Sequence, residues 1–205
     1  MKLYFAPGAC SFSPHLALRE AGLEFTLIRV DLGTKTTHEG DDFTRVNPKG
    51  QVPALVLDDG AVLTEGPAIV QYVADQAPDK HLAPPNGTFA RYQLQEWLNY
   101  ISTELHKTFG PLFSKGTTEE TRESIKAVLA RRFAWVAGQL EGREFLLGER
   151  YTVADGYLYT MLSWARFVGL DLSAHPRLGE YFARIKARPS VAAAIAAENA
   201  LRAKV

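Results

Sequence analysis

Cysteine is almost absent from the sequence. Cys10 is the single cysteine among 205 residues, so no disulfide can form within the chain, and a reducing, cytoplasmic setting is favoured. One cysteine also cannot build a thiolate zinc site, and the five histidines do not show the spacing of a metal-binding motif. We therefore expect neither a disulfide nor a metal.

The chain also lacks an excess of charge and any long hydrophobic run. Its 23 Lys and Arg residues balance 23 Asp and Glu residues, so no field attracts a polyanion, and nucleic-acid binding is not expected. The first apolar stretch stops at Pro7-Gly8 and is too short for a signal peptide. The longest later run, Val191 to Ala197, falls far below the ~18 residues that span a bilayer. Association with a membrane is not predicted.

The residues that are present indicate two folded domains. Hydrophobic residues make up 46% of the chain and charged residues 22%, which is typical of a globular protein. Prolines and an Asn-Gly pair between residues 78 and 87 interrupt regular structure. Segments before this stretch are short and of mixed period, whereas later ones have helical period. We expect a domain over 1–80, a linker over 81–87 and an all-helical domain over 88–205.

The first part predicts an α/β domain. Its expected elements are a strand over 2–5, a helix that contains Pro14 and ends at Gly22, a strand over 23–32, a hairpin over 54–64 and a helix from Gly66-Pro67 to about Gln76. Residues 33–46 are polar and irregular. The order βαβ, a polar connection, then ββα predicts a mixed four-stranded sheet with helices on its faces.

The second part predicts helices throughout. They are expected from Thr88 to about Phe109, from a Thr117–Glu120 capping box to near Gly142, from a Thr152–Asp155 capping box to Gly169, and in two shorter segments separated by Arg188-Pro189. In the first of these, apolar residues recur at steps of four, three and four, and this stripe is predicted to face a core: Leu94, Leu98, Ile101 and Leu105.

Cys10 is the first candidate site residue. It stands between the first strand and the first helix, where a helix N-terminus favours a thiolate, its own or a ligand's. Ser13 occupies the position of a resolving cysteine, so a mixed disulfide at Cys10 would persist until another thiol attacks it. A buried, inert cysteine is the alternative interpretation.

Two further motifs in the first part can hold a peptide-like ligand. If the Val52-Pro53 bond is cis, Val52 turns its backbone N–H and C=O toward Cys10 as an antiparallel partner for a peptide. Otherwise Pro53 only opens an edge strand. At Glu65-Gly66 a helix begins, where the N–H of Gly66 can face a carboxylate and the Glu65 side chain an ammonium. The alternative for Glu65 is a surface carboxylate at the positive end of the helix dipole.

In the second part, Asn99, Thr103 and His106 share one face of a predicted helix, because they are spaced four and three residues apart. A polar stripe is usually a solvated face. The absence of Lys and Glu from these three positions is the indication that this one lines a cleft.

Six segments together carry a family pattern. They are MKLYFAPGAC at 1–10, NPKGQVPAL at 47–55, LTEGPAI at 63–69, EWLNYI at 96–101, TELHK at 103–107 and YTVAD at 151–155. With these segments the sequence resembles the bacterial β-class glutathione S-transferases over essentially the whole chain. The resemblance implies a thioredoxin-like N-terminal domain, an all-helical C-terminal domain, and a cytoplasmic homodimer that uses glutathione and no further cofactor.

The resemblance also implies the site residues. Catalytic roles fall on Cys10, His106 and Ser11, each of which can donate a hydrogen bond to a thiolate. The implied glutathione-binding residues, some of them contributed by the neighbouring subunit, are Cys10, Lys35, Val52, Pro53, Glu65, Gly66, Asn99, Thr103, Glu104, Leu105 and His106. Gly66 departs from the Ser of other members, which leaves only its N–H for the γ-glutamyl carboxylate. An electrophile is expected at Phe109, Phe113 and Trp164.

The predicted function is conjugation of glutathione to small hydrophobic electrophiles, with thiol–disulfide exchange or dehalogenation as further reactions of the same site. Two alternatives are a non-catalytic interaction protein that keeps the fold and a monothiol glutaredoxin-like reductase. The sequence does not name the electrophile.

Overall fold

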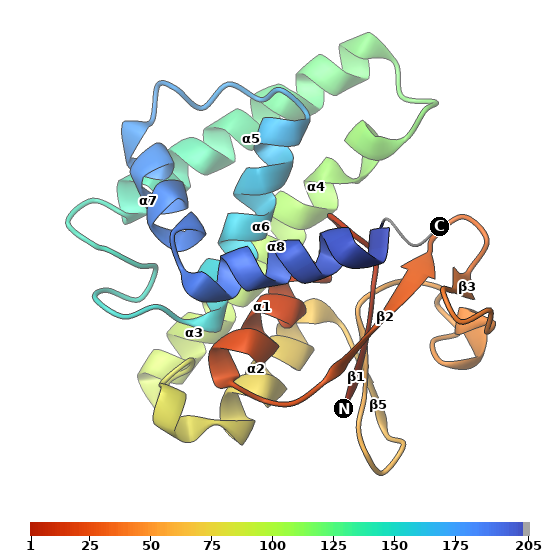
Figure 1. Ribbon diagram of the computed structural model, residues 1–205. Coiled ribbons are helices and arrows are strands. Elements are labelled where there is room, and N and C mark those ends of the chain that lie inside the picture. Colours follow the sequence, from red (N-terminus) through yellow and green to blue (C-terminus); the bar gives the residue numbers. More distant parts are fainter. Residues whose placement is uncertain (203–205) are drawn as a thin grey trace. The chain divides into compact units, whose positions relative to one another are not determined.

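The structure is a computed structural model in which residues 1–202 are described. The chain forms two compact units, one made of Met1–Ala83 with the segment from Arg188 onward, and the other of Pro84–Ala187. Among the described residues, every β-strand lies in the first unit, and the second unit is helical (Figure 1). The predicted fold class, an α/β domain followed by a helical one, is confirmed.

A mixed sheet organises the first unit. Its strands among residues 1–202 are β1 (Lys2–Phe5), β2 (Thr26–Asp31), β3 (Thr36–Thr37), β4 (Ala54–Val56) and β5 (Val62–Thr64), in the order β3-β2-β1-β4-β5. β1 and β2 are parallel, and the other neighbours are antiparallel. The expected four-stranded sheet is therefore wrong by one strand. β3 was missed because two residues are too few to show alternation, and only its pairing with Val30 and Asp31 defines it.

The α-helices of the first unit are α1 (Phe12–Ala21), α2 (Gly66–Gln76) and α8 (Pro189–Arg202), with short 3₁₀ turns at η1 (Phe43–Arg45) and η2 (Pro78–Lys80). α1 packs against both α2 and α8. Leu16 and Leu18 are fully buried with Leu3 and Phe5 of β1. Gly22 ends α1 in the left-handed conformation, φ 67°, as the predicted cap requires.

The last helix, α8, belongs to the first unit, whereas we expected a single helical domain over 88–205. Arg188 donates two hydrogen bonds to the Glu20 carboxylate of α1, at 2.6 and 2.7 Å. Further along α8, Glu198 is buried and accepts from the backbone N–H of Gly8 at 3.2 Å, and it lies 3.0 Å from Nδ1 of His15. Charged side chains thus tie α8 to α1 and to the turn before Cys10, contacts that no local pattern predicts.

The second unit consists of α3 (Phe89–Tyr100), a π-helical turn η3 (Ile101–His106), α4 (Lys107–Phe109), η4 (Gly110–Phe113), α5 (Glu119–Gln139), α6 (Val153–Phe167) and α7 (Pro176–Lys186). The predicted helix from Thr88 to Phe109 is continuous, but its middle turn is π-helical. The stripe predicted to face a core is buried: Leu94, Leu98, Ile101 and Leu105 are at most 1% exposed. No helix within residues 1–202 combines the length and hydropathy needed to cross a bilayer.

Helix starts in the second unit follow the predicted capping residues closely. Asp155 is fully buried and accepts from the N–H and hydroxyl of Thr152, at 2.7 and 3.0 Å. It also accepts from the N–H of Leu146 at 2.8 Å and from the hydroxyl of Tyr181 at 2.7 Å. The same carboxylate therefore binds the loop before α6 and helix α7 to the start of α6. The start of α5 is one residue later than expected, because Thr118 is the cap and the Thr117 hydroxyl donates to Pro111 instead.

Candidate active site

Cys10 lies in the turn between β1 and α1, beside the Val52–Pro53 bond. That bond is cis, and the Cys10 thiol donates to the Val52 carbonyl with Sγ 3.4 Å from the oxygen. The first unit therefore brings three predicted site residues, Cys10, Val52 and Pro53, to one place. The neighbouring Ser11 is fully buried, and its hydroxyl bonds the backbone N–H and C=O of Ala6 at 3.2 and 3.3 Å. In this geometry the Ser11 hydroxyl holds the turn.

The sequence left open whether the helix N-terminus favours a thiolate of Cys10 or of a ligand, and the surroundings of Cys10 disfavour its own thiolate. Burial raises the pKa of its thiol from 9.0 to about 11, and the negative charge of Glu65 adds to the rise. The backbone N–H groups of Cys10 and Ser11 lower the pKa, but by less than burial raises it. The helix N-terminus alone does not produce a thiolate here. At neutral pH Cys10 is a hydrogen-bond donor.

Glu65 and Lys35 both occupy strained backbone positions in the first unit. Their φ angles are 69° and 60°, a region that residues other than glycine rarely adopt outside functional sites. Glu65 is the N-cap of α2, which begins at Gly66. Lys35 donates from Nζ to the carbonyl of Gly50 at 3.0 Å. A Cβ at Gly66 would lie 4.0 Å from Cγ of Pro53, so the predicted residues 65 and 66 adjoin the cis-proline.

Lys49 is a site candidate that the sequence interpretation missed. Its ammonium pairs with the Glu65 carboxylate and donates to the Thr64 hydroxyl at 2.8 Å. The Glu65 carboxylate was expected to face a ligand's ammonium, and it demonstrates that capacity here with a lysine. Lys49 stands inside the quoted segment 47–55, but its side chain reaches Glu65 from another loop, which spacing does not reveal.

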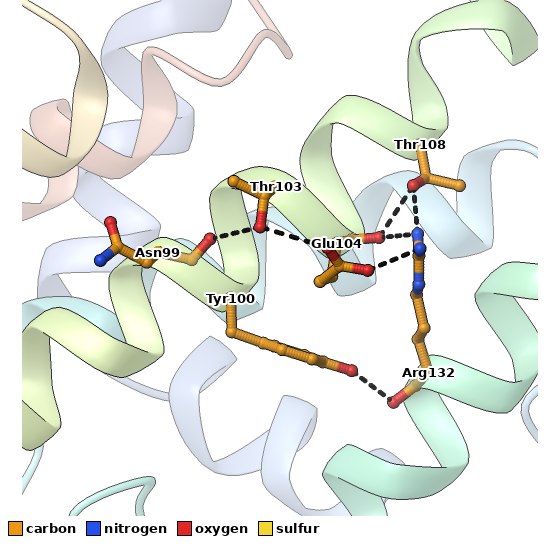
Figure 2. A network of polar contacts seen from close by, with 6 residues as sticks. All are labelled: Asn99, Tyr100, Thr103, Glu104, Thr108 and Arg132. Atoms are coloured by element: carbon orange, nitrogen blue, oxygen red, sulfur yellow. Dashed lines mark hydrogen bonds and ion pairs between the residues drawn. The ribbon is translucent and has the colours of Figure 1, made fainter.

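In the second unit, Asn99, Thr103 and His106 lie along α3 and the π-turn. The Thr103 hydroxyl lies 3.1 Å from the Asn99 carbonyl and 3.4 Å from Oε1 of Glu104 (Figure 2). Asn99 and Thr103 are exposed and Glu104 and His106 partly so, whereas the Leu105 side chain is buried in the core. The side chain of Leu105, one of the predicted glutathione-binding residues, is therefore closed to a ligand. π-helical turns occur frequently at functional sites.

His106 leads into a group of aromatic side chains in the same unit. Its Nδ1 lies 2.6 Å from the Tyr157 hydroxyl, and its ring meets Trp164 edge-on with centroids 5.0 Å apart. Phe109 and Phe113 pack edge-on against Trp164 at 5.7 and 5.0 Å. The three residues predicted to receive an electrophile are thus in mutual contact.

Two members of this aromatic group were not predicted. Tyr157 holds His106 from α6, and Phe167, which is 81% exposed, packs on Phe113 with centroids 6.4 Å apart. Tyr157 is the residue after Gly156 and sits within a run of buried helix, so its sequence context suggested only core.

Comparison with known proteins decides the family. Residues 8–76 match the model of the glutathione S-transferase N-terminal domain, and residues 119–184 match that of the C-terminal domain. Glutathione S-transferase GstA of Escherichia coli O157:H7 is 48% identical over 97% of this chain and 99% of its own. The chain belongs to the bacterial β-class glutathione S-transferases.

Solved structures of glutathione S-transferases agree in fold with the two units. BphK, a bacterial glutathione S-transferase solved as a ternary complex, has a TM-score of 0.95 at 54% identity and covers 97% of this chain and 100% of its own. The β-class enzyme of Sphingomonas chungbukensis has a TM-score of 0.94 at 48% identity, covering 97% and 98%. The chain is accordingly a glutathione S-transferase whose co-substrate is glutathione, and the two alternative functions are not favoured.

Proposed function

We propose that this glutathione S-transferase conjugates the glutathione thiolate to small hydrophobic electrophiles, with Cys10 as a hydrogen-bond donor to the glutathione sulfur. The thiolate attacks the electrophilic carbon, a carbon–sulfur bond forms, and the leaving group departs with its electron pair. A thiol of pKa about 8.5 is only about 3% ionised at pH 7, and lowering the pKa by two units raises this to about 76%. Donors aimed at the sulfur supply that shift.

The observation that carries this proposal is the hydrogen bond in which the Cys10 thiol is the donor. Its thiol already donates a hydrogen bond, to the Val52 carbonyl at 3.4 Å, and its pKa of about 11 keeps the proton in place at neutral pH. A thiolate sulfur is a better acceptor than a carbonyl oxygen because it carries a full charge. Cys10 is suited to stabilising another thiolate and poorly suited to attacking a disulfide itself.

Glutathione recognition is assigned to charges and backbone groups in each unit. In the first, Val52 offers its backbone to the cysteinyl residue, Lys35 pairs with a carboxylate of the ligand, and Glu65 with Gly66 holds the γ-glutamyl end. In the second, Asn99 and the Thr103–His106 turn complete the set. The aromatic group of Phe109, Phe113 and Trp164 receives the electrophile. We further propose a cytoplasmic homodimer that needs no other cofactor.

The mechanism is tested with Cys10→Ala. We expect this variant to keep a substantial fraction of aryl-halide conjugation, because His106 remains as a donor. Disulfide reduction with glutathione should be slow in the wild type, because the raised pKa of Cys10 leaves little thiolate, and the variant should lose that residual activity, since the sulfur of Cys10 must itself attack the disulfide. Steady-state kinetics of both reactions on the one variant provide the measurement. Conjugation kinetics identical to those of the wild type would remove the donor role. Loss of conjugation by three or more orders of magnitude at unchanged glutathione affinity would exceed the effect of one hydrogen bond and make Cys10 essential to thiolate activation.

The homodimer is tested by light scattering during size-exclusion chromatography. The expected mass is twice that of the 22.7 kDa chain. A monomer that remains fully active would remove the proposed contribution of a neighbouring subunit to the site.

A further inference from the structure

One arginine of another helix, Arg132, makes several hydrogen bonds to the π-turn. Arg132 of α5 donates from Nη1 to the backbone carbonyl of Glu104 and to the hydroxyl of Thr108, and its Nη2 lies 2.6 Å from Oε2 of Glu104 (Figure 2). Thr108 also donates to the Glu104 carbonyl at 2.9 Å. The Tyr100 hydroxyl donates to the backbone carbonyl of Arg132 at 3.4 Å. Arg132 therefore holds the π-turn at three points: the Glu104 carbonyl, the Glu104 carboxylate and the hydroxyl of Thr108, which follows the turn.

These contacts fix geometry more than they add stability. The side chains of Arg132 and Glu104 are 28% and 41% exposed, and an ion pair screened by that much solvent contributes little to folding. A guanidinium, however, is planar and donates in several fixed directions at once, which a flexible ammonium does not reproduce. Only the arginine can hold the Glu104 carbonyl and carboxylate together in one orientation.

The fixed carboxylate borders the face that carries Asn99 and Thr103. Oε1 of Glu104, the oxygen on the other side from the arginine contact, lies 3.4 Å from the Thr103 hydroxyl, and that hydroxyl lies 3.1 Å from the Asn99 carbonyl. An α-helical turn would place residues 103 to 106 differently around the axis, because a π-turn hydrogen-bonds five residues apart. The direction of these side chains thus depends on the π-turn staying closed.

We propose that Arg132 is a positioning residue for glutathione binding: it holds Glu104 and the π-turn so that the Thr103–His106 face points at the ligand. The inference rests on the proposed glutathione site, and Arg132 itself makes no contact with glutathione in it.

The test compares Arg132→Met with Arg132→Lys and with Thr108→Val, which removes only the hydroxyl shared by Arg132 and the Glu104 carbonyl. Arg131→Met is the matched control, since Arg131 is the preceding, exposed residue of α5 and has no part in the network of Figure 2. Circular dichroism establishes that each variant is folded. Glutathione affinity is measured by calorimetry, and KM for glutathione and for an aryl halide by steady-state kinetics.

We expect Arg132→Met to weaken glutathione binding and raise its KM about 10-fold, since small misplacements of binding groups cost that much or more. Arg132→Lys should recover only part of the loss, and Thr108→Val should show a smaller rise. KM for the aryl halide and all constants of Arg131→Met should stay within about twofold. Unchanged glutathione affinity in a folded Arg132→Met or Thr108→Val, or an equal rise of both KM values, overturns the proposal.

Asn99→Ala and His106→Ala separate this result from a failure of the site itself. If both bind glutathione as the wild type does, the proposed site and the role of Arg132 are overturned together. If they weaken binding while the Arg132 and Thr108 variants do not, the site stands and only the positioning role is overturned.

Discussion

Cys10 shows how the surroundings of one atom decide its chemical role. A cysteine at the start of a helix is often ionised, because the helix dipole and free N–H groups stabilise the thiolate. Here loss of solvation and the nearby charge of Glu65 outweigh those groups, and the pKa of the thiol rises. A cysteine at this position in the sequence can be a nucleophilic thiolate or a thiol that donates a hydrogen bond. Only the packing around the sulfur decides between these two roles.

The raised pKa predicts the pH dependence of Cys10 alkylation. In the native protein without glutathione, the rate of reaction with iodoacetamide should rise with a midpoint near pH 11, against about 9 in the unfolded chain. Between these two values the unfolded chain has lost the proton and the native chain has kept it, so this group makes native stability fall as pH rises through that window. Intact mass at timed intervals gives the rates. A native midpoint below 8 would refute the assignment.

Tyr157 offers a second prediction for a single residue. Its hydroxyl lies 2.6 Å from Nδ1 of His106, so Tyr157→Phe removes one hydrogen bond and leaves the packed ring. We expect kcat for aryl-halide conjugation to fall about 2- to 10-fold, the effect of one hydrogen bond. The imidazole resonances of His106, followed by NMR, should change in the same variant, because the ring loses the partner of its Nδ1. Tyr159→Phe, on the same helix, should leave both kcat and these resonances unchanged, and unchanged resonances in Tyr157→Phe would remove the orienting role.

Among the elements, α6 begins at a capping box whose carboxylate, that of Asp155, is fully buried. Asp155→Ala leaves the donors of Leu146, Thr152 and Tyr181 buried without their acceptor. Each such loss costs about 1–3 kcal/mol, and we expect at least about 3 kcal/mol less stability by urea denaturation. Asp155→Asn should cost less, because one acceptor oxygen remains. Asp171→Ala, which removes only an exposed contact to Ser173, should change stability by under about 1 kcal/mol.

Which elements could be predicted depended on how local their causes are. Gly22, Pro67 and Asp155 mark helix ends by their own chemistry, and the structure has those ends within one residue. The π-turn could not be predicted, because the apolar stripe at steps of four, three and four suits an α-helix equally well and the closing side chain, Arg132, comes from another helix. The two-residue strand β3 could not be predicted for the same reason, since only its pairing with β2 defines it.

The candidate site divides in the same way. Cys10, Pro53 and Glu65 with Gly66 could be named as candidates because each belongs to a contiguous motif. Lys49, Tyr157 and Arg132 could not, since each contacts a candidate residue through one long side chain that comes from a distant part of the sequence. Spacing along a chain carries no information about such contacts.

For the molecule as a whole, the attachment of α8 to the first unit makes Glu198 a residue of that unit's core. Glu198→Ala removes the acceptor of the Gly8 N–H and leaves His15, which is also bonded by Arg19 at 2.8 Å, without its carboxylate. We expect the free energy of unfolding to fall by about 3 kcal/mol or more, as it does when one partner of a buried pair is removed. Because Gly8 precedes Cys10 in the same turn, alkylation of Cys10 at fixed pH should become faster.

Thermal denaturation and the alkylation rate test this prediction together. Glu24→Ala, at an exposed position of the same unit, is the control and should alter neither. A Glu198→Ala protein with wild-type stability would show that the contacts of Glu198 with Gly8 and His15 do not stabilise the first unit.

That attachment also has a consequence for the order in which the protein is made. Protein synthesis releases the N-terminal segment first, and domains generally fold as soon as they emerge. The first unit cannot do so completely, because His15 and the N–H of Gly8 meet their shared carboxylate only when residue 198 has left the ribosome. The helices of Pro84–Ala187 are synthesised in between and contain all the residues of their own unit. Translation therefore releases all of Pro84–Ala187 before it releases the last contacts of the first unit, and the turn between β1 and α1 waits for α8.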